Sequence, residues 1–103
     1  MLTQNFIEKG AVMAKVCVVA ENKADVKCFK VTQEFKADLL VYEVDKDFKA
    51  KHDGLWYFED RDSKATSTIA WVSQESKADL KVMFVDKDFK AKWKKPHKLQ
   101  NRL

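Results

Sequence analysis

The sequence predicts an all-β fold: a compact single domain of about six short strands, built from 13-residue repeats in two 41-residue windings. Three observations support this prediction. A short unit recurs along the chain, the apolar segments are rich in Val, Phe, Tyr and Trp, and no apolar stripe persists at the helical period of 3.6 residues. Of the 103 residues 46% are hydrophobic and 35% are charged, which suits one globular domain with a modest core.

The repeated unit is marked by the dipeptide Lys-Ala, whose alanines are spaced by 13, 13, 15, 13 and 13 residues. These alanines are Ala24, Ala37, Ala50, Ala65, Ala78 and Ala91. A longer repeat contains them: residues 33–51 and 74–92 are identical at 15 of 19 positions, and both end in VDKDFKAK. A chain that passes around a ring in three units, and then passes around it again, has two such copies. We therefore expect two windings of three units each.

The expected strands are the apolar runs of these units, which polar turns separate. In chain order they lie at residues 16–20, 28–31, 39–44, 55–58, 67–72 and 80–85. At 3.3 Å per residue, each run spans at most roughly 20 Å. Some runs, such as LKVMFV at 80–85, carry adjacent apolar residues in place of strict alternation, which is typical of strands buried on both faces.

The predicted core takes a few apolar residues from each strand, together with the six repeated alanines. The strand residues are Val16, Val18, Phe29, Val31, Leu39, Val41, Val44, Trp56, Phe58, Ile69, Val72, Leu80, Val82 and Val85. A surface turn would accept many residues in place of the alanine, so its recurrence predicts a point where backbones cross closely. The alternative is that the alanines are relics of duplication.

Three segments of the chain occur in the order typical of a known family. They are the repeat KADLKVMFVDKDFKA at 77–91, the junction KAKHDGLWYF at 49–58, and the closing AKWKK at 91–95 with its basic tail. On these motifs the chain resembles the septoil-knot domain family of small bacterial proteins, whose repeats are of the type ESQADLKVYFVDYESQA. The resemblance runs from about Met13 to the end. The chain departs from the family pattern in its first twelve residues, and in having Lys-Asp-Phe where Tyr-Glu-Ser is common.

The resemblance implies a compact β protein whose backbone winds twice around itself into a seven-crossing torus knot. True knots are rare enough that periodicity and composition alone would not propose one. The family has no established activity, so the resemblance supplies no catalytic residues.

The repeats divide the chain into three parts. Residues 13–93 form the repeat β domain, residues 1–12 are a leader that matches no unit, and residues 94–103 are a basic C-terminal tail. We expect Met13 to be the natural start. No secretory signal precedes the domain and the longest apolar run is far too short to span a bilayer, so we expect a cytoplasmic protein without membrane contact. We also expect a monomer.

No motif of the sequence indicates catalysis, a cofactor or a metal. His52 and Asp53 lie beside Gly54, where a turn is expected, and the acidic residues near Asp60 lack the spacing of a calcium loop. Cys17 and Cys28 are expected as small buried thiols, since free cysteine packs as a small hydrophobic residue. A disulfide between them is the alternative, and it is disfavoured because we expect a reducing compartment. We therefore expect no enzyme, no cofactor and no metal site.

The C-terminal tail holds the one constellation with a plausible ligand. Six of the 20 basic residues lie from Lys90 onward and no acidic residue does, so the rest of the chain carries 14 basic against 16 acidic residues. Lysines attract phosphates and a tryptophan stacks on bases. The candidate anion-binding residues are Lys92, Trp93, Lys94, Lys95, Lys98 and Arg102. The alternative is a solubilising tail in which Trp93 packs on the sheet.

Two classes of function remain open to the sequence. The first is a stable structural or protein-interaction module, of unknown role and with no chemistry of its own. The second is weak binding of a polyanion, such as a nucleic acid, through the basic tail.

Overall fold

The computed structural model describes residues 14–100 and 103, so the predicted leader at residues 1–12, Met13 and Arg102 lie outside the described residues. Strands alternate with single turns of 3₁₀-helix, and the described residues contain no α-helix. The strands are β1 (Ala14–Val18), β2 (Val26–Lys30), β3 (Leu39–Glu43), β4 (Leu55–Phe58), β5 (Ser67–Trp71), β6 (Leu80–Phe84) and β7 (Lys92–Trp93). The turns are η1 (Glu21–Lys23), η2 (Glu34–Lys36), η3 (Asp47–Lys49), η4 (Asp62–Lys64), η5 (Glu75–Lys77) and η6 (Asp88–Lys90). The predicted all-β fold is confirmed.

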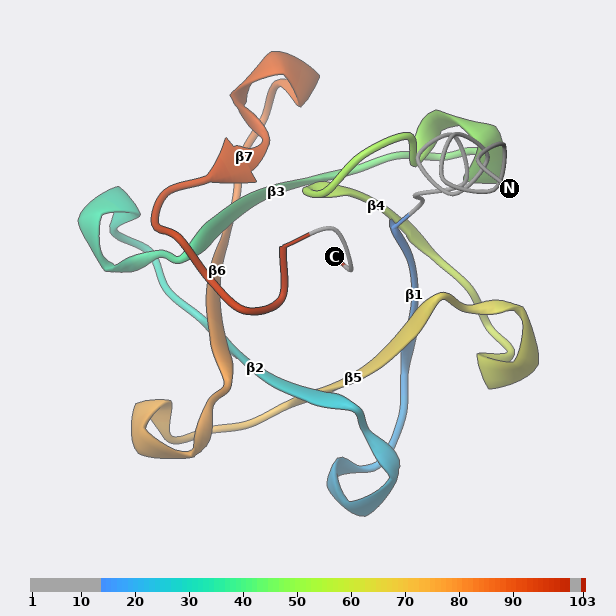
Figure 1. Ribbon diagram of the computed structural model, residues 1–103, viewed down its shortest axis with the longest axis horizontal. Helices are drawn as coiled ribbons and strands as arrows, with labels where there is room; N and C mark the ends of the chain where they lie inside the picture. The colour runs from blue at the N-terminus through green and yellow to red at the C-terminus, as the bar shows by residue number, and fades with distance from the viewer. Residues whose placement is uncertain (1–13, 101–102) are drawn as a thin grey trace, which may run out of the picture.

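Strands β1 to β6 form a closed parallel barrel in the order β1, β5, β2, β6, β3, β4 and back to β1. Strands from the first half of the chain therefore alternate around the ring with strands from the second half. The chain passes around the ring twice, as Figure 1 shows, and the six turns project outward from it like arms. The knot itself stays a prediction from the resemblance.

Each strand pairs with one neighbour through its first residues and with the other neighbour through its last. In β1, for example, Val16 faces Phe58 of β4 on one side and Ser67 of β5 on the other. The strands are thus strongly staggered. Because all six are parallel, their amino ends meet at one face of the barrel and their carboxyl ends at the opposite face.

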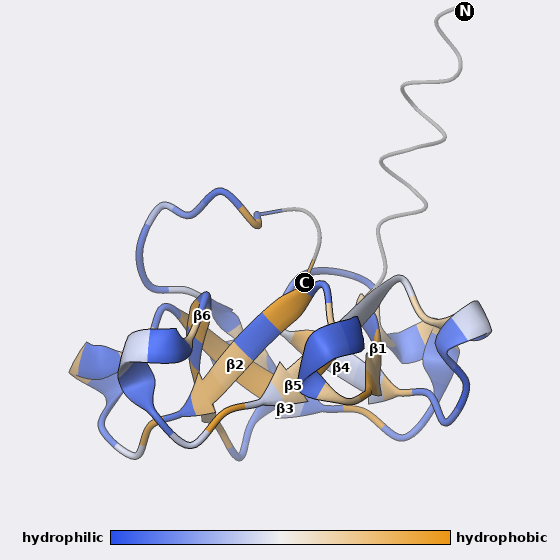
Figure 2. Cartoon of the chain, turned by 90° about the horizontal axis from the view of Figure 1, so that it is seen from below, coloured by the Kyte–Doolittle hydropathy of each residue, from blue (hydrophilic) through white to orange (hydrophobic). Residues whose placement is uncertain are grey.

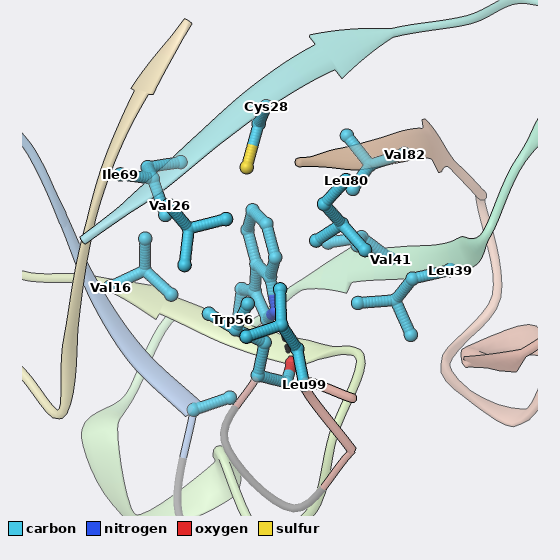
Figure 3. Close-up of a cluster of buried hydrophobic side chains, with 12 residues drawn as sticks. Val16, Val26, Cys28, Leu39, Val41, Trp56, Ile69, Leu80, Val82 and Leu99 are labelled. Atoms are coloured by element: carbon cyan, nitrogen blue, oxygen red, sulfur yellow. Dashed lines mark hydrogen bonds between the residues drawn. The ribbon is translucent and has the colours of Figure 1, made fainter. Parts of the chain in front are cut away.

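The inward side chains form three layers along the barrel. The amino-end layer contains Ala14, Val26, Leu39, Ser67 and Leu80, and the middle layer contains Val16, Cys28, Val41, Trp56, Ile69 and Val82; all of these are buried. The carboxyl-end layer contains Val18, Lys30, Glu43, Phe58, Trp71 and Phe84, which are half-buried or exposed. Figure 3 shows the middle layer converging on the Trp56 ring.

The core prediction is wrong at Val18, which is 47% exposed. The alternation along β1 places Val18 on the inner side, but in the layer at the open carboxyl-end face, where little covers it. Phe29, Phe58 and Val85 are half-buried, and the other ten predicted strand residues are buried. The predicted strand residues leave out Val26, which is a buried member of the amino-end layer.

The Lys-Ala dipeptide has the same role in all six units. The 3₁₀ turn ends at the lysine, and the amide of the following alanine donates to the carbonyl oxygen three residues earlier. Ala37, Ala50 and Ala91 are buried, and the other three alanines are half-buried. Ala91 lies where the windings touch: a Cβ added to Gly54 would lie 3.1 Å from Ala91 Cβ and 2.9 Å from the Leu40 carbonyl oxygen.

In two units the aspartate that follows the alanine joins the two windings. The Asp79 amide donates to the Lys27 carbonyl oxygen at 2.7 Å, while its carboxylate accepts from the Lys27 amide at 3.0 Å. Asp38 holds Lys81 in the same way, with the same two distances. The side chain thus replaces one backbone acceptor at the point where the chain enters the next strand.

The C-terminal segment, which follows β7 and is described at residues 94–100 and 103, closes the amino-end face. It runs across the ring in Figure 1 and above the barrel in Figure 2. Leu99 and Leu103 belong to the main core cluster. The Leu103 oxygen accepts from the Trp56 indole nitrogen and, at 2.8 Å, from the Gly54 amide. These contacts stabilise the central tryptophan with residues that lie beyond the repeats.

We expect Ala91→Leu to destabilise the protein by about 1–3 kcal/mol, because Ala91 is buried against Gly54 and leaves no room for added methylenes. Lys90→Leu, beside it, should change stability little, since the Lys90 ion pair with Asp86 is exposed. Urea unfolding at equilibrium measures both variants. Equal midpoints would leave the alanine as a relic of duplication.

Asp79→Ala should cost about 0.5–1.5 kcal/mol, because it removes the acceptor of the Lys27 amide. Asp79→Asn keeps an acceptor oxygen in the same place and should retain most of the stability. The same unfolding measurement compares the two variants. An Asn variant as weak as the Ala variant would show that the charge, and not the hydrogen bond, matters at this crossing.

Candidate interaction surface

The basic residues of the predicted anion site are spread over the C-terminal segment, and two of them bind carboxylates of the barrel. Lys94 donates to Glu34 at 2.8 Å, which lowers the pKa of that carboxyl group, and Lys95 lies 3.9 Å from Asp38. Lys92 and Lys98 are exposed, whereas Arg102 lies outside the described residues. The lysines that dock the segment onto the barrel thus already face negative charge.

Trp93 anchors the same segment. Its indole nitrogen donates to the Asp53 carboxylate at 2.6 Å, and its ring stacks on His97 with the centroids 5.3 Å apart. It also packs against the main core cluster. His97 occupies one face of the ring, so a nucleobase could stack on that face only by displacing it.

The interior of the barrel is filled by side chains. Trp56 has no exposed surface, and the rings of Phe58 and Phe84 meet it edge-on at centroid distances of 6.0 and 6.2 Å. Within residues 14–100 and 103, no group of three His, Cys, Asp or Glu side chains is placed to hold a metal ion. In the same part of the chain, no helix is long and apolar enough to cross a membrane.

Both cysteines are free and buried, which confirms the expectation of two buried thiols. Burial, followed by the nearby Asp79 carboxylate, raises the pKa of the Cys28 thiol to about 12. Burial, with smaller effects from Asp62 and other acidic residues, also raises the pKa of Cys17. Neither thiol has the low pKa of a reactive cysteine.

The outer rim carries the largest exposed apolar side chains. Phe35 of η2, Phe48 of η3 and Phe89 of η6 each lie in the middle of a 3₁₀ turn, with exposures of 71%, 62% and 77%. The other three turns have Asn22, Ser63 and Ser76 at the same position. In Figure 1 the turns η2, η6 and η3 are three consecutive arms, so the phenylalanines share one half of the rim.

Two grooves separate these three turns. The groove between η2 and η6, of about 550 Å³, is lined by Glu34, Leu40, Met83, Phe84, Val85, Asp86, Phe89, Lys90 and Lys92. The groove between η6 and η3, of about 660 Å³, is lined by Tyr42, Glu43, Val44, Asp45, Lys49, Lys51, His52, Leu55 and Asp88. We call the three turns with their two grooves the phenylalanine rim. The first groove has the more apolar floor.

Sequence reasoning missed this surface because it treated VDKDFKAK as a turn that links strands. The signal was present: the residue before Lys-Ala is Phe in three units and Asn or Ser in the other three. Only the order of strands around the ring shows that the three Phe units are neighbours.

The motifs and the barrel agree with one family. The family model described as the 7(1) septoil knot domain matches residues 13–94. The chain belongs to this family. Neither a curated protein nor a solved structure matches the chain. For this septoil knot domain, the surface of the chain itself is the available indication of function.

The thiols provide a direct check of the buried interior. At pH 8 we expect Ellman's reagent to react with much less than one thiol per native chain within minutes, because the thiolate is the reactive form and the pKa of Cys28 is about 12. Both cysteines should react once the chain is unfolded in guanidinium chloride. Rapid reaction of two thiols in the native protein would contradict the closed barrel.

Proposed function

We propose that the protein is a non-catalytic interaction module and that the phenylalanine rim is its binding surface. The observation that carries this proposal is the exposure of three phenylalanines on consecutive turns. Burying a phenylalanine contributes about 1.5–3 kcal/mol, so leaving three in water forgoes a large part of what a marginally stable domain has available.

The turns themselves do not need phenylalanine. The η4 turn has Ser63 and the η5 turn has Ser76 at the central position, and both end in the same hydrogen bond from the alanine as the turns with Phe. The aromatic side chain therefore adds nothing to the local backbone structure. A contact outside the chain is the remaining use for it, since aromatic residues are enriched at the centres of interfaces.

The absence of catalysis is supported by the same geometry. The barrel interior is occupied by Trp56 and its neighbours, and both thiols have raised pKa values. The alternative function, weak polyanion binding through the C-terminal segment, is favoured by the exposed Lys92 and Lys98. It is weakened by the carboxylate partners of Lys94 and Lys95.

Selection from a displayed peptide library tests the proposal. Peptides are selected on the wild-type protein, and their affinity is then measured for the triple variant Phe35→Ser/Phe48→Ser/Phe89→Ser. We expect affinity to fall at least about tenfold, the equivalent of 1.4 kcal/mol, because burying even one phenylalanine contributes that much. Val18→Ser, at the open carboxyl-end face, is the matched control and should bind like the wild type.

Two outcomes would contradict the proposal. Peptides that bind the wild type and the triple variant equally would show that the binding surface lies outside the phenylalanine rim. Labelled single-stranded DNA that binds with a steep salt dependence, equally to both proteins, would favour the polyanion alternative. Fluorescence anisotropy at two salt concentrations measures the second.

A further inference from the structure

The phenylalanine rim presents projections and grooves on one surface. Each turn is a ridge with an exposed phenylalanine, and each groove lies between two ridges. The groove between η2 and η6 has an apolar floor that includes Leu40, Met83 and Val85. The edges of this groove carry negative charge from Glu34 and Asp86 and positive charge from Lys90 and Lys92. An occupant that fits is an aromatic side chain flanked by an acidic and a basic residue.

The chain's own turns have this composition. In η6, Phe89 stands between Asp88 and Lys90, and in η2, Phe35 stands between Glu34 and Lys36. We infer, on the basis of the function proposed above, that the partner of the rim is a second copy of this chain. The sequence analysis expects a monomer, and the self-complementary rim is the reason to depart from that expectation.

A two-fold axis satisfies both grooves at once. In a symmetric dimer the same patch is used by both copies, so each contact occurs twice. With the axis between η6 and the groove beside η2, the η6 ridge of each copy enters that groove of the other copy. The η2 ridge then faces the partner's groove between η6 and η3. Phe89 lies nearest the axis, Phe35 lies further out, and Phe48 lies at the periphery.

The charges of the rim favour a copy over a strongly charged partner. Asp86 is paired with Lys90 at 3.4 Å, Asp45 with Lys49 at 3.0 Å, and Glu34 with Lys94 at 2.8 Å. The ridges therefore present nearly neutral pairs, which neither attract a polyanion nor repel an identical surface. Like-charge repulsion, the usual obstacle to self-association, is small here.

The area that such a contact buries places it among the smallest specific interfaces. A phenylalanine buries at most about 150–250 Å², so four of them with the groove walls give on the order of 1,200 Å², the lower limit of specific interfaces. An interface at this lower limit, with few anchors, is expected to be weak and to form only at micromolar or higher concentrations.

Sedimentation equilibrium of the full chain between about 5 and 500 μM tests the inference, with the concentration range set by that expected affinity. The average mass should rise from the 12.0 kDa of one chain toward twice that value. Phe89→Ser should weaken association at least about tenfold, Phe35→Ser less, and Phe48→Ser by no more than about twofold. The triple variant should stay monomeric, whereas Val18→Ser should associate like the wild type.

Serine is compatible with these turns, as Ser63 and Ser76 show, and near-UV circular dichroism of the buried Trp56 verifies the fold of each variant. A wild-type protein that stays monomeric at 500 μM overturns the dimer, and association that survives in the triple variant overturns its location. A monomer that still selects rim-binding peptides would refute the dimer alone, and leave the interaction module standing.

Discussion

The structure depends on one constraint: within the barrel, every strand forms its hydrogen bonds with strands of the other winding. β1 pairs with β4 and β5, and β2 with β5 and β6, so neither bonds to the next strand of its own winding. β3 does bond to its neighbour in sequence, β4, but β4 is the first strand of the second winding. A single 13-residue unit can therefore form none of its inter-strand backbone hydrogen bonds alone. The first winding gains its backbone partners only when the second winding lies between its strands, which makes the barrel cooperative and its contacts non-local.

The regularity of the turns follows from this alternation. Each unit has to leave the ring and return so that the other winding can pass beside it. A single 3₁₀ turn and an alanine without bulk provide such a return. In the units of Asp38 and Asp79, the aspartate also hydrogen-bonds to the other winding. The unit between Ala50 and Ala65 is two residues longer than the others and breaks the pattern. There Gly54, at φ 91°, lets the chain lie against Ala91, and Trp56 enters the centre, where other strands have Val, Ile or Cys. The C-terminal segment then covers that larger side chain.

Periodicity predicted which residues of a strand share a side, but it could not predict which end of the barrel is covered. This is why Leu80 and Val82 are buried as expected and Val18, on the same side of its own strand, is not. Leu99 and Leu103 lie in a basic segment that looks solvated, and only the three-dimensional position of Trp56 reveals that they are needed. The sequence could not predict that the three Phe turns are neighbours either, because their adjacency comes from the alternation of windings and not from the order of the chain.

The same constraint also determines where this fold can carry function. Inward positions fill the barrel, the alanines lie near the crossings, and Asp38 and Asp79 bond to the other winding, so changing any of them costs stability. The central residue of each turn contacts none of these, as the exposure of Asn22, Ser63 and Ser76 shows beside that of the three phenylalanines. Six such positions point outward around the ring, and alternation brings units from different windings side by side. Three substitutions far apart in the chain thus produce one continuous surface without disturbing the barrel that supports it.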